Sequence, residues 1–205
     1  MTDSNAINLK IGMFGGGGVG KTCLTLRYLK GEFSEGYIPT IEDEFAKVVE
    51  VNGKTVSLNV IDTAGQDDFA EMRYSYFRQV QGFVFVFDIG NQSSIDDLRV
   101  IYNDAKGAND DENIKCVIAA NKADLREDPK GDLVSTDEYK KLEDEFKCKV
   151  VETSAKTGSG VDELFKVIIA KLIDKDKPAA QPKNTEKKKN QKKGESSEGG
   201  CCLIA

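Results

Sequence analysis

A glycine-rich segment, GGGGVGKT at residues 15–22, constrains this chain more than any other feature. It follows an apolar run that ends at Phe14 and precedes a helix-like run that begins near Leu24. A G-x-x-x-x-G-K-[ST] turn between a strand and a helix brings backbone N–H groups close to phosphate oxygens, because glycine has no Cβ and readily adopts positive φ. Lys21 then supplies a point charge to the β and γ phosphates, and the Thr22 hydroxyl can ligate Mg²⁺. The segment therefore predicts a phosphate-binding loop rather than a merely flexible glycine turn.

Six apolar runs bounded by turn residues are typical of strands: residues 8–14, 45–51, 56–61, 83–89, 116–120 and 150–151. Residues 83–87 and 116–120 are continuously apolar, as in parallel strands covered on both faces. Asn52-Gly53 separates the second and third runs, and this pair is a strong hairpin signal. The sequence thus predicts an α/β fold, a P-loop NTPase-type mixed sheet of six strands, five parallel and one antiparallel, with helices on both faces.

Three helices are well marked, and the last is the clearest. Its apolar face, at helical spacing, consists of Val161, Leu164, Phe165, Ile168, Ile169, Leu172 and Ile173. Ser135 is predicted to cap a helix that runs to about Phe146, because Glu138 completes a capping box. Ser93 or Ser94 is predicted to cap another helix.

The helical periodicity stops after Ile173, and the following Lys, Pro, Ser, Glu and Gly residues offer too little apolar surface to offset the entropy of ordering. We therefore expect a nucleotide-binding domain over residues 1–173 and a disordered basic tail over 174–205. The tail has a net charge of +3, which leaves −9 for the domain out of −6 for the whole chain. An acidic domain argues against nucleic acid as a partner, because nucleic-acid binding needs a basic face.

Three further features of the sequence indicate in which cellular compartment the protein works. No apolar run approaches the length of a membrane span, and the N-terminus lacks a secretory signal. Thr2 stands where N-myristoylation would require glycine. We expect a protein that stays on the cytosolic side, with Cys23, Cys116 and Cys148 as reduced core residues.

Two polar segments follow strands at the carboxyl end, where ligands of open α/β sheets bind. In the first, residues 62–66, Asp62 offers a carboxylate to Mg²⁺ and Gly65 can present its N–H group to a γ-phosphate. Gln66 is neutral and both donates and accepts, which suits holding an attacking water in line.

The second segment is Asn121-Lys122-Ala123-Asp124, in which the Asp124 carboxylate can accept two N–H donors from a guanine edge that adenine does not offer. The residues alone would also fit an Asx turn that leaves a strand. Residues 153–156 after the last strand supply a further loop on the base side, where the Ala155 N–H group can donate to the guanine O6.

The order of these segments closely resembles that of the Ras family of small GTPases over residues 8–173. The resemblance implies that Thr40 is the switch I threonine, which ligates Mg²⁺ and contacts the γ-phosphate. It also implies that Phe33 lies across the guanine, that Gly17 lies nearest the γ-phosphate, and that Tyr37 closes over the nucleotide.

By this resemblance, the complete nucleotide-binding set is Gly15, Gly17, Gly18, Val19, Gly20, Lys21, Thr22, Cys23, Phe33, Tyr37, Thr40, Gly65, Asn121, Lys122, Asp124, Ser154, Ala155 and Lys156. The Mg²⁺ ligands are Thr22, Thr40 and Asp62, and the catalytic residues are Gln66, Lys21, Thr40 and Gly65.

The implied activity is slow hydrolysis of GTP to GDP and phosphate by a monomeric signalling switch. By the same resemblance, residues 62–66 begin switch II. Arg27 is expected on the first helix and Arg73 beyond switch II, so neither is placed to reach the γ-phosphate. An activating protein should therefore supply an arginine in trans, and an exchange factor should release GDP.

Effector proteins would bind through Ile38–Asp43, a segment similar to that of Ras and Rap proteins, and through switch II. A permanent nucleotide-binding scaffold and an ATP-dependent kinase are the alternatives.

The chain ends in Cys202-Leu203-Ile204-Ala205, a C-a-a-X pattern whose terminal Ala favours farnesylation. One lipid chain binds a bilayer only marginally, so a second signal is needed. The five lysines within Lys187–Lys193 would supply it, and Cys201 offers a second lipidation site. We expect attachment through prenylated Cys202 to the cytoplasmic face of a cell membrane, most simply the plasma membrane.

Overall fold

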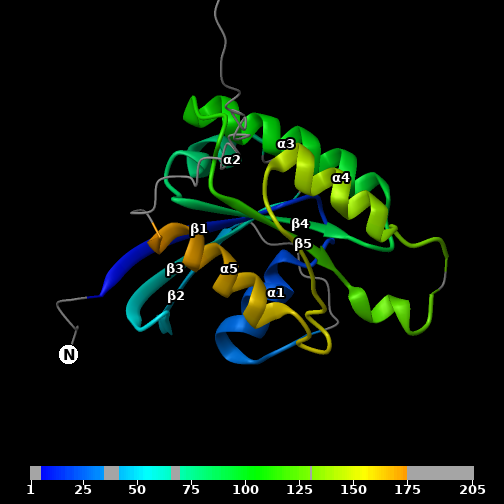
Figure 1. The fold of residues 1–205 in the computed structure, drawn as a ribbon, viewed down its shortest axis with the longest axis horizontal. Coiled ribbons are helices and arrows are strands. Elements are labelled where there is room, and N and C mark those ends of the chain that lie inside the picture. Colours follow the sequence, from blue (N-terminus) through cyan, green and yellow to red (C-terminus); the bar gives the residue numbers. More distant parts are fainter. Residues whose placement is uncertain (1–5, 35–41, 66–69, 130, 175–205) are drawn as a thin grey trace, which may run out of the picture. The chain divides into compact units, whose positions relative to one another are not determined.

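Six strands form one sheet in the order β2-β3-β1-β4-β5-β6 (Figure 1). The computed structural model describes residues 6–34, 42–65, 70–129 and 131–174. The strands are β1 (Ile7–Phe14), β2 (Glu42–Val51), β3 (Lys54–Thr63), β4 (Gly82–Asp88), β5 (Cys116–Asn121) and β6 (Val150–Glu152). The helices are α1 (Lys21–Lys30), α2 (Ala70–Phe77), α3 (Ser93–Asn109), α4 (Thr136–Phe146) and α5 (Val161–Ile173), with a short 3-10 helix, η2, at Ala123–Arg126.

The sheet is mixed, as predicted. β2 pairs with β3 in antiparallel register, and every other pair of neighbouring strands is parallel. Asn52 and Gly53 connect β2 to β3 with φ of 53° and 70°, the left-handed backbone that a two-residue hairpin of type I′ requires. The predicted hairpin and the count of five parallel strands and one antiparallel strand are therefore confirmed.

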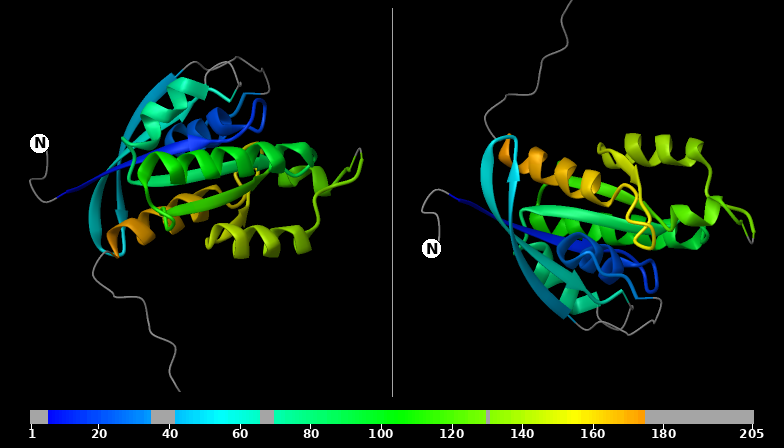
Figure 2. Two further views of the ribbon diagram at one scale, coloured as in Figure 1. Left: turned by 90° about the horizontal axis from the view of Figure 1, so that it is seen from above. Right: turned by 90° about the horizontal axis from the view of Figure 1, so that it is seen from below.

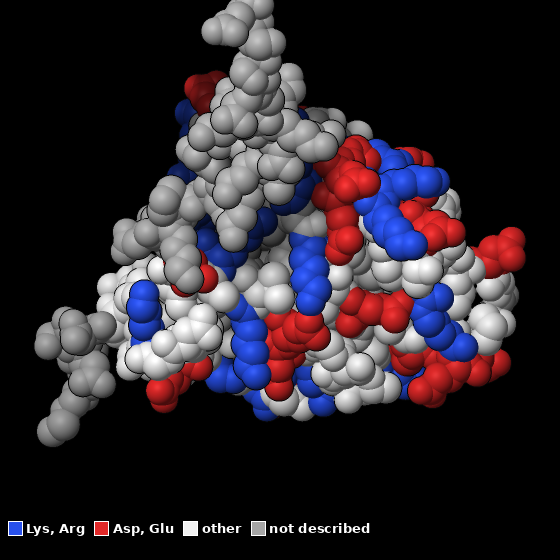
Figure 3. Space-filling view, in the orientation of Figure 1, with Lys and Arg blue, Asp and Glu red and all other residues white. Residues whose placement is uncertain are grey.

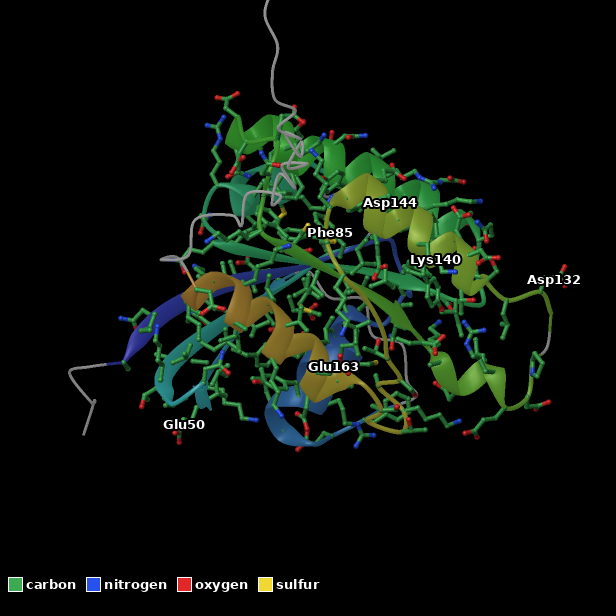
Figure 4. All side chains as sticks on the ribbon, viewed as in Figure 1. Glu50, Phe85, Asp132, Lys140, Asp144 and Glu163 are labelled. Atoms are coloured by element: carbon green, nitrogen blue, oxygen red, sulfur yellow. The ribbon has the colours of Figure 1, made fainter. Side chains whose placement is uncertain are left out.

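The side chains of β4 and β5 alternate between two cores, one on each face of the sheet. The ribbon in Figure 2 shows that helices lie over both faces. Phe83, Phe85 and Phe87 face α2, α3 and α4, and Figure 4 shows Phe85 beneath the last two of these helices. Val84 and Val86 face the opposite way, toward α1 and α5. Continuous apolar runs were needed in these strands because both of their faces are buried.

Two of the three predicted helices begin and pack as expected. The Ser135 side chain accepts a hydrogen bond of 3.3 Å from the Glu138 N–H group at the start of α4. All seven apolar residues predicted for the last helix are buried in α5. Within the described ranges, no helix is both long enough and apolar enough to cross a bilayer.

The prediction that Ser93 or Ser94 caps α3 was wrong. The cap position is Gln92, whose side chain makes no capping hydrogen bond. Asn91 takes over the capping role, because its side-chain oxygen accepts from the Ser93 N–H group at 3.1 Å. The Ser94 hydroxyl instead accepts from the Asp88 N–H group at 3.1 Å and donates to the Asn91 carbonyl at 2.6 Å. It thereby ties the start of α3 to the end of β4.

The three described cysteines are free thiols. Cys116 and Cys148 are buried in the core beneath α3 and α4, as expected. The two thiols interact with each other. This interaction lowers the pKa of Cys116 and raises the pKa of Cys148. Cys23 differs from the expectation, since it is only half-buried on α1 and its thiol lies 3.8 Å from the Ser34 carbonyl.

An ion-pair network joins α3 to α4 on the surface, where acidic and basic side chains alternate (Figure 3). The Arg99 guanidinium lies 3.2 Å from Asp96 on its own helix, and 3.1 Å from both Glu138 and Glu145 on α4. These contacts raise the pKa of Arg99, and the contacts from Lys141 and Arg99 lower the pKa of Glu138.

Replacing Arg99 by Ala should lower the free energy of unfolding by about 1 kcal/mol, since three partly exposed ion pairs are lost together. In a domain of this size that is a fall in Tm of roughly 2–4 °C. Lys140→Ala is the matched control, because its pair with Asp137 is exposed on both sides. Equal effects of the two substitutions in thermal unfolding would contradict this account of the α3–α4 contact.

Candidate nucleotide-binding site

The glycine loop between β1 and α1 is packed tightly at both ends and open in the middle. A Cβ atom on Gly15 would lie 2.2 Å from the Val86 carbonyl oxygen, and one on Gly20 would lie 2.4 Å from the Asn121 amide nitrogen. Both glycines have positive φ, 151° and 96°. At Gly17 and Gly18, by contrast, no described atom lies within 4 Å of the Cβ position. The backbone of the loop is thus held rigidly at its ends and exposed where a phosphate would approach.

Lys21, the first residue of α1, folds back over this loop. Its ammonium group donates to the carbonyls of Gly15 and Gly16 at 2.9 and 2.8 Å. Burial lowers its pKa to about 8, while the nearby Asp62 carboxylate acts in the opposite direction. A buried ammonium group whose hydrogen bonds to the described residues go to carbonyl groups is well placed to bind an anion at the mouth of the loop.

Asp62, near the end of β3, carries a buried carboxylate. Its side chain is fully buried, and neither oxygen accepts a hydrogen bond of ordinary geometry from the described residues. Burial raises its pKa to about 6, although the Thr22 hydroxyl and Lys21 lie close enough to oppose that rise. A buried carboxylate without a partner is costly, and a divalent cation would compensate it.

The donor set therefore fits Mg²⁺, held by Asp62 and Thr22. Among the described residues no group of three His, Cys, Asp or Glu side chains could hold a metal. Mg²⁺ is commonly bound by one or two protein ligands, with phosphate oxygens and water completing its coordination. The third predicted ligand, Thr40, lies outside the described residues.

Gly65 lies directly against the glycine loop. A Cβ atom there would be 2.4 Å from the Gly16 carbonyl oxygen and 2.4 Å from the Lys21 ammonium nitrogen. The backbone of residue 65 can reach this position only because it carries no side chain. The predicted γ-phosphate sensor therefore borders the predicted phosphate cradle, and Gln66, the next residue, lies outside the described residues.

Asn121, at the end of β5, links the phosphate end of the site to the base end. Its amide nitrogen donates to the Val19 carbonyl at 2.8 Å. Its amide oxygen accepts from the Thr153 hydroxyl and from the Ala155 N–H group, both at 3.3 Å. The side chain is almost fully buried, so these bonds hold the loops after β1, β5 and β6 together.

Asp124 and Ser154 join the two loops predicted to read the base. The Ser154 hydroxyl donates to Asp124 at 2.6 Å and accepts from the Thr157 N–H group at 3.2 Å. The Ala123 N–H group also donates to the Thr153 carbonyl at 3.0 Å. The Asp124 carboxylate is thereby fixed in orientation, which a bidentate contact to a guanine edge requires.

Sequence reasoning did not find Asp88, at the end of β4. Its carboxylate lies 2.7 Å from the Lys122 ammonium group and accepts a hydrogen bond of 2.9 Å from the Gly90 N–H group. Asp88 stands opposite Asn121 in the register of β4 and β5, and this position at a strand's carboxyl end was the available signal. It orients Lys122, whose backbone is in the left-handed region with φ of 66°.

The described members of the predicted set come together at the carboxyl ends of β1, β3, β5 and β6. They are Gly15, Gly17, Gly18, Val19, Gly20, Lys21, Thr22, Asp62, Gly65, Asn121, Lys122, Asp124, Ser154 and Ala155, with Cys23, Phe33 and Lys156 close by in the chain. Tyr37, Thr40, Gln66 and Cys202 lie outside the described residues, as do residues 38–41 of the effector segment and residues 187–193 of the tail.

Gly65→Ala should weaken binding of GTP by about tenfold, because the new Cβ must displace either the Gly16 carbonyl or the Lys21 ammonium group. GDP, which lacks the γ-phosphate, should lose less. Binding of fluorescent analogues of both nucleotides measures this difference. Gly107→Ala in α3 is the control, since no described atom lies within 4 Å of its Cβ position. Unchanged GTP affinity in Gly65→Ala would show that this residue does not border the γ-phosphate position.

Comparison with known proteins agrees with this geometry. The model of the Ras family matches residues 10–174. The chain is also 36% identical to Protein ras-1 of Neurospora crassa over 168 residues, which are 82% of this chain and 78% of that protein. The family match begins within β1, covers the other five strands in full and reaches past the end of α5. The chain therefore belongs to the Ras family.

Proposed function

We propose that this protein binds GTP and GDP together with Mg²⁺ and slowly hydrolyses GTP, as a switch that binds effector proteins in the GTP state. The observation that carries the proposal is the buried carboxylate of Asp62, whose oxygens accept no hydrogen bond of ordinary geometry from the described residues, beside Lys21 and the open glycine loop. Asp124, held by Ser154, gives the same site its means of selecting guanine.

The proposal assigns the following roles to the chain's own residues. The open backbone at residues 17–18 and the Lys21 ammonium group would bind the β and γ phosphates. Asp62 and Thr22, with Thr40, would hold Mg²⁺, which when bound neutralises charge that develops on the phosphate oxygens. Gly65 would donate its N–H group to the γ-phosphate, and Gln66 would orient the attacking water.

An activating protein is part of this proposal. Arg27 is engaged with backbone carbonyls at the base end of the site, and Arg73 is buried on α2. Arg27 is therefore not free to approach the γ-phosphate, whereas Arg73 lies near enough to Lys21 to lower the pKa of its ammonium group. We assign stabilisation of the transition-state charge to an arginine from a partner. The same reasoning assigns release of GDP to an exchange factor.

Effector proteins would bind along Ile38–Asp43 and switch II. Asp43 lies on β2, the edge strand of the sheet, next to Glu42. The Glu42 carboxylate accepts a hydrogen bond from Tyr76 of α2, the helix that follows switch II, so β2 and α2 are joined in this structure. A partner that binds one of them would therefore also meet the other.

The tail would place the switch at a membrane. Prenylation of Cys202, together with the lysines of Lys187–Lys193, would hold the domain at the cytoplasmic face of a cell membrane, and the plasma membrane is the simplest choice. The C-a-a-X pattern and the lysine cluster support this assignment.

Single-turnover hydrolysis separates this function from a permanent nucleotide-binding scaffold. Protein loaded with GTP should release phosphate slowly, and an extract that contains activating proteins should accelerate the release. Gln66→Leu should abolish the acceleration, because a leucine cannot orient water. Absence of phosphate release under both conditions would favour the scaffold.

Asp124→Asn tests the contact to guanine. The amide can donate as well as accept, so the preference should shift from guanine toward xanthine nucleotides. Competition of xanthosine and guanosine diphosphates against a fluorescent guanine nucleotide measures the shift. Asp132→Asn is the control, since Asp132 is exposed on the loop that follows η2 (Figure 4). A variant that keeps the wild-type preference would remove Asp124 from the base site.

A further inference from the structure

Arg27 on α1 reaches the loop that follows β6, across more than a hundred residues of sequence. Its Nε atom donates to the Ala155 carbonyl at 2.7 Å, and one terminal nitrogen donates to the Lys156 carbonyl at 2.6 Å. The other terminal nitrogen donates to the Gly31 carbonyl at 2.8 Å, at the end of α1. All three nitrogens of the guanidinium group are therefore occupied by backbone carbonyls.

The same guanidinium group lies over the ring of Phe33, with its central carbon 5.7 Å from the ring centre. The stem of Arg27 passes within 3.8 Å of the Cβ position of Gly158, which has a φ of 88° and follows the same loop. Arg27 thus touches the end of α1, the aromatic residue that follows it, and both ends of the turn at residues 155–158.

These contacts require an arginine. A planar fork with five N–H donors can bond several carbonyls at fixed angles and still present its face to an aromatic ring. A lysine has one nitrogen on a flexible stem and cannot bond three separate carbonyls in this geometry. Consecutive carbonyls of Ala155 and Lys156 point at one cation, which fixes the backbone immediately after the Ala155 N–H group.

We propose that Arg27 is a positioning residue for the guanine end of the site. It holds Phe33 and the loop of residues 153–156 to α1, so that the parts that enclose the base move as one unit and nucleotide release is slow. The inference rests on the proposed function, since it assumes that the base lies between Phe33 and this loop. It also explains why Arg27 is not available as a catalytic arginine.

Dissociation of a fluorescent GDP, chased with excess unlabelled GDP in the presence of Mg²⁺, tests the proposal on the full-length protein. Arg27→Gln should raise the dissociation rate by about tenfold, because the bonds to both loop carbonyls and the contact to Phe33 are lost together. Arg27→Lys, which keeps the charge but not the fork, should raise it by a smaller factor.

Lys47→Gln is the matched control. The Lys47 ammonium group also bonds a carbonyl of α1, that of Tyr28 at 2.7 Å, and lies over the Tyr28 ring, but it touches neither Phe33 nor residues 153–156 in the described contacts. Its removal should leave the dissociation rate within about twofold of wild type, the scale of a change remote from the site.

A second readout separates positioning from general destabilisation. In Arg27→Gln the rate constant for single-turnover hydrolysis of GTP that stays bound should change much less than the dissociation rate, since the phosphate end is not touched. If Arg27 acts partly through Phe33, the effects of Arg27→Gln and Phe33→Leu on dissociation should be less than additive. Should Arg27→Gln fail to fold, the Arg27→Lys variant carries the test.

The dissociation experiment distinguishes a failure of the proposed function from a failure of the role proposed for Arg27. A wild-type protein that does not retain fluorescent GDP would overturn the proposed function itself. A wild-type protein that retains it, with Arg27→Gln and Arg27→Lys releasing it at the wild-type rate, would overturn only the role of Arg27. An equal loss of hydrolysis and of nucleotide retention would also contradict that role, because it would indicate general unfolding.

Discussion

The site depends on the packing of one glycine loop against the carboxyl ends of the central strands. Gly15 lies against the carbonyl of Val86 on β4, and Gly20 lies against the amide of Asn121 on β5. These contacts leave no room for a Cβ atom, so both positions require glycine. The exposed backbone between the two contacts then begins a helix, where an anion is electrostatically favoured.

Side chains from distant parts of the chain extend this rigid loop into a longer site. Asn121 ties the loop to the base end, Ser154 holds Asp124, and Asp88 holds Lys122. Arg27, on α1, adds hydrogen bonds to the carbonyls of Ala155 and Lys156. The phosphate end is held by backbone packing, whereas the base end is held by side-chain hydrogen bonds and ion pairs. Substitutions at the base end should therefore change nucleotide retention more than they change folding.

Much of the fold could be predicted from local patterns. The six apolar runs are the six strands, and the Asn52-Gly53 pair marked the only antiparallel connection among the described strands. The helix α2 escaped prediction because its pattern is reversed: Arg73 is buried, while Met72 and Tyr74 are exposed. The cap of α3 was assigned to the wrong residue, since several short polar side chains compete there and the sequence alone does not rank them.

The site was predictable in so far as its residues stand next to one another in motifs. Lys21, Asp62 and Asp124 were predicted in this way, and the structure brings their loops to one edge of the sheet. Asp88 and Arg27 were not assigned to the site, because their partners lie far away in the sequence and only the register and packing reveal them. Their roles depend on tertiary geometry that no local spacing encodes.

Calorimetric titration with GDP and with ADP, each with Mg²⁺ and with a chelator, tests the central claim most directly. The account predicts tight binding of GDP, weaker binding when Mg²⁺ is removed because the buried Asp62 carboxylate then lacks its cation, and little binding of ADP. Equal affinities for GDP and ADP, or GDP binding that does not depend on Mg²⁺, would contradict it.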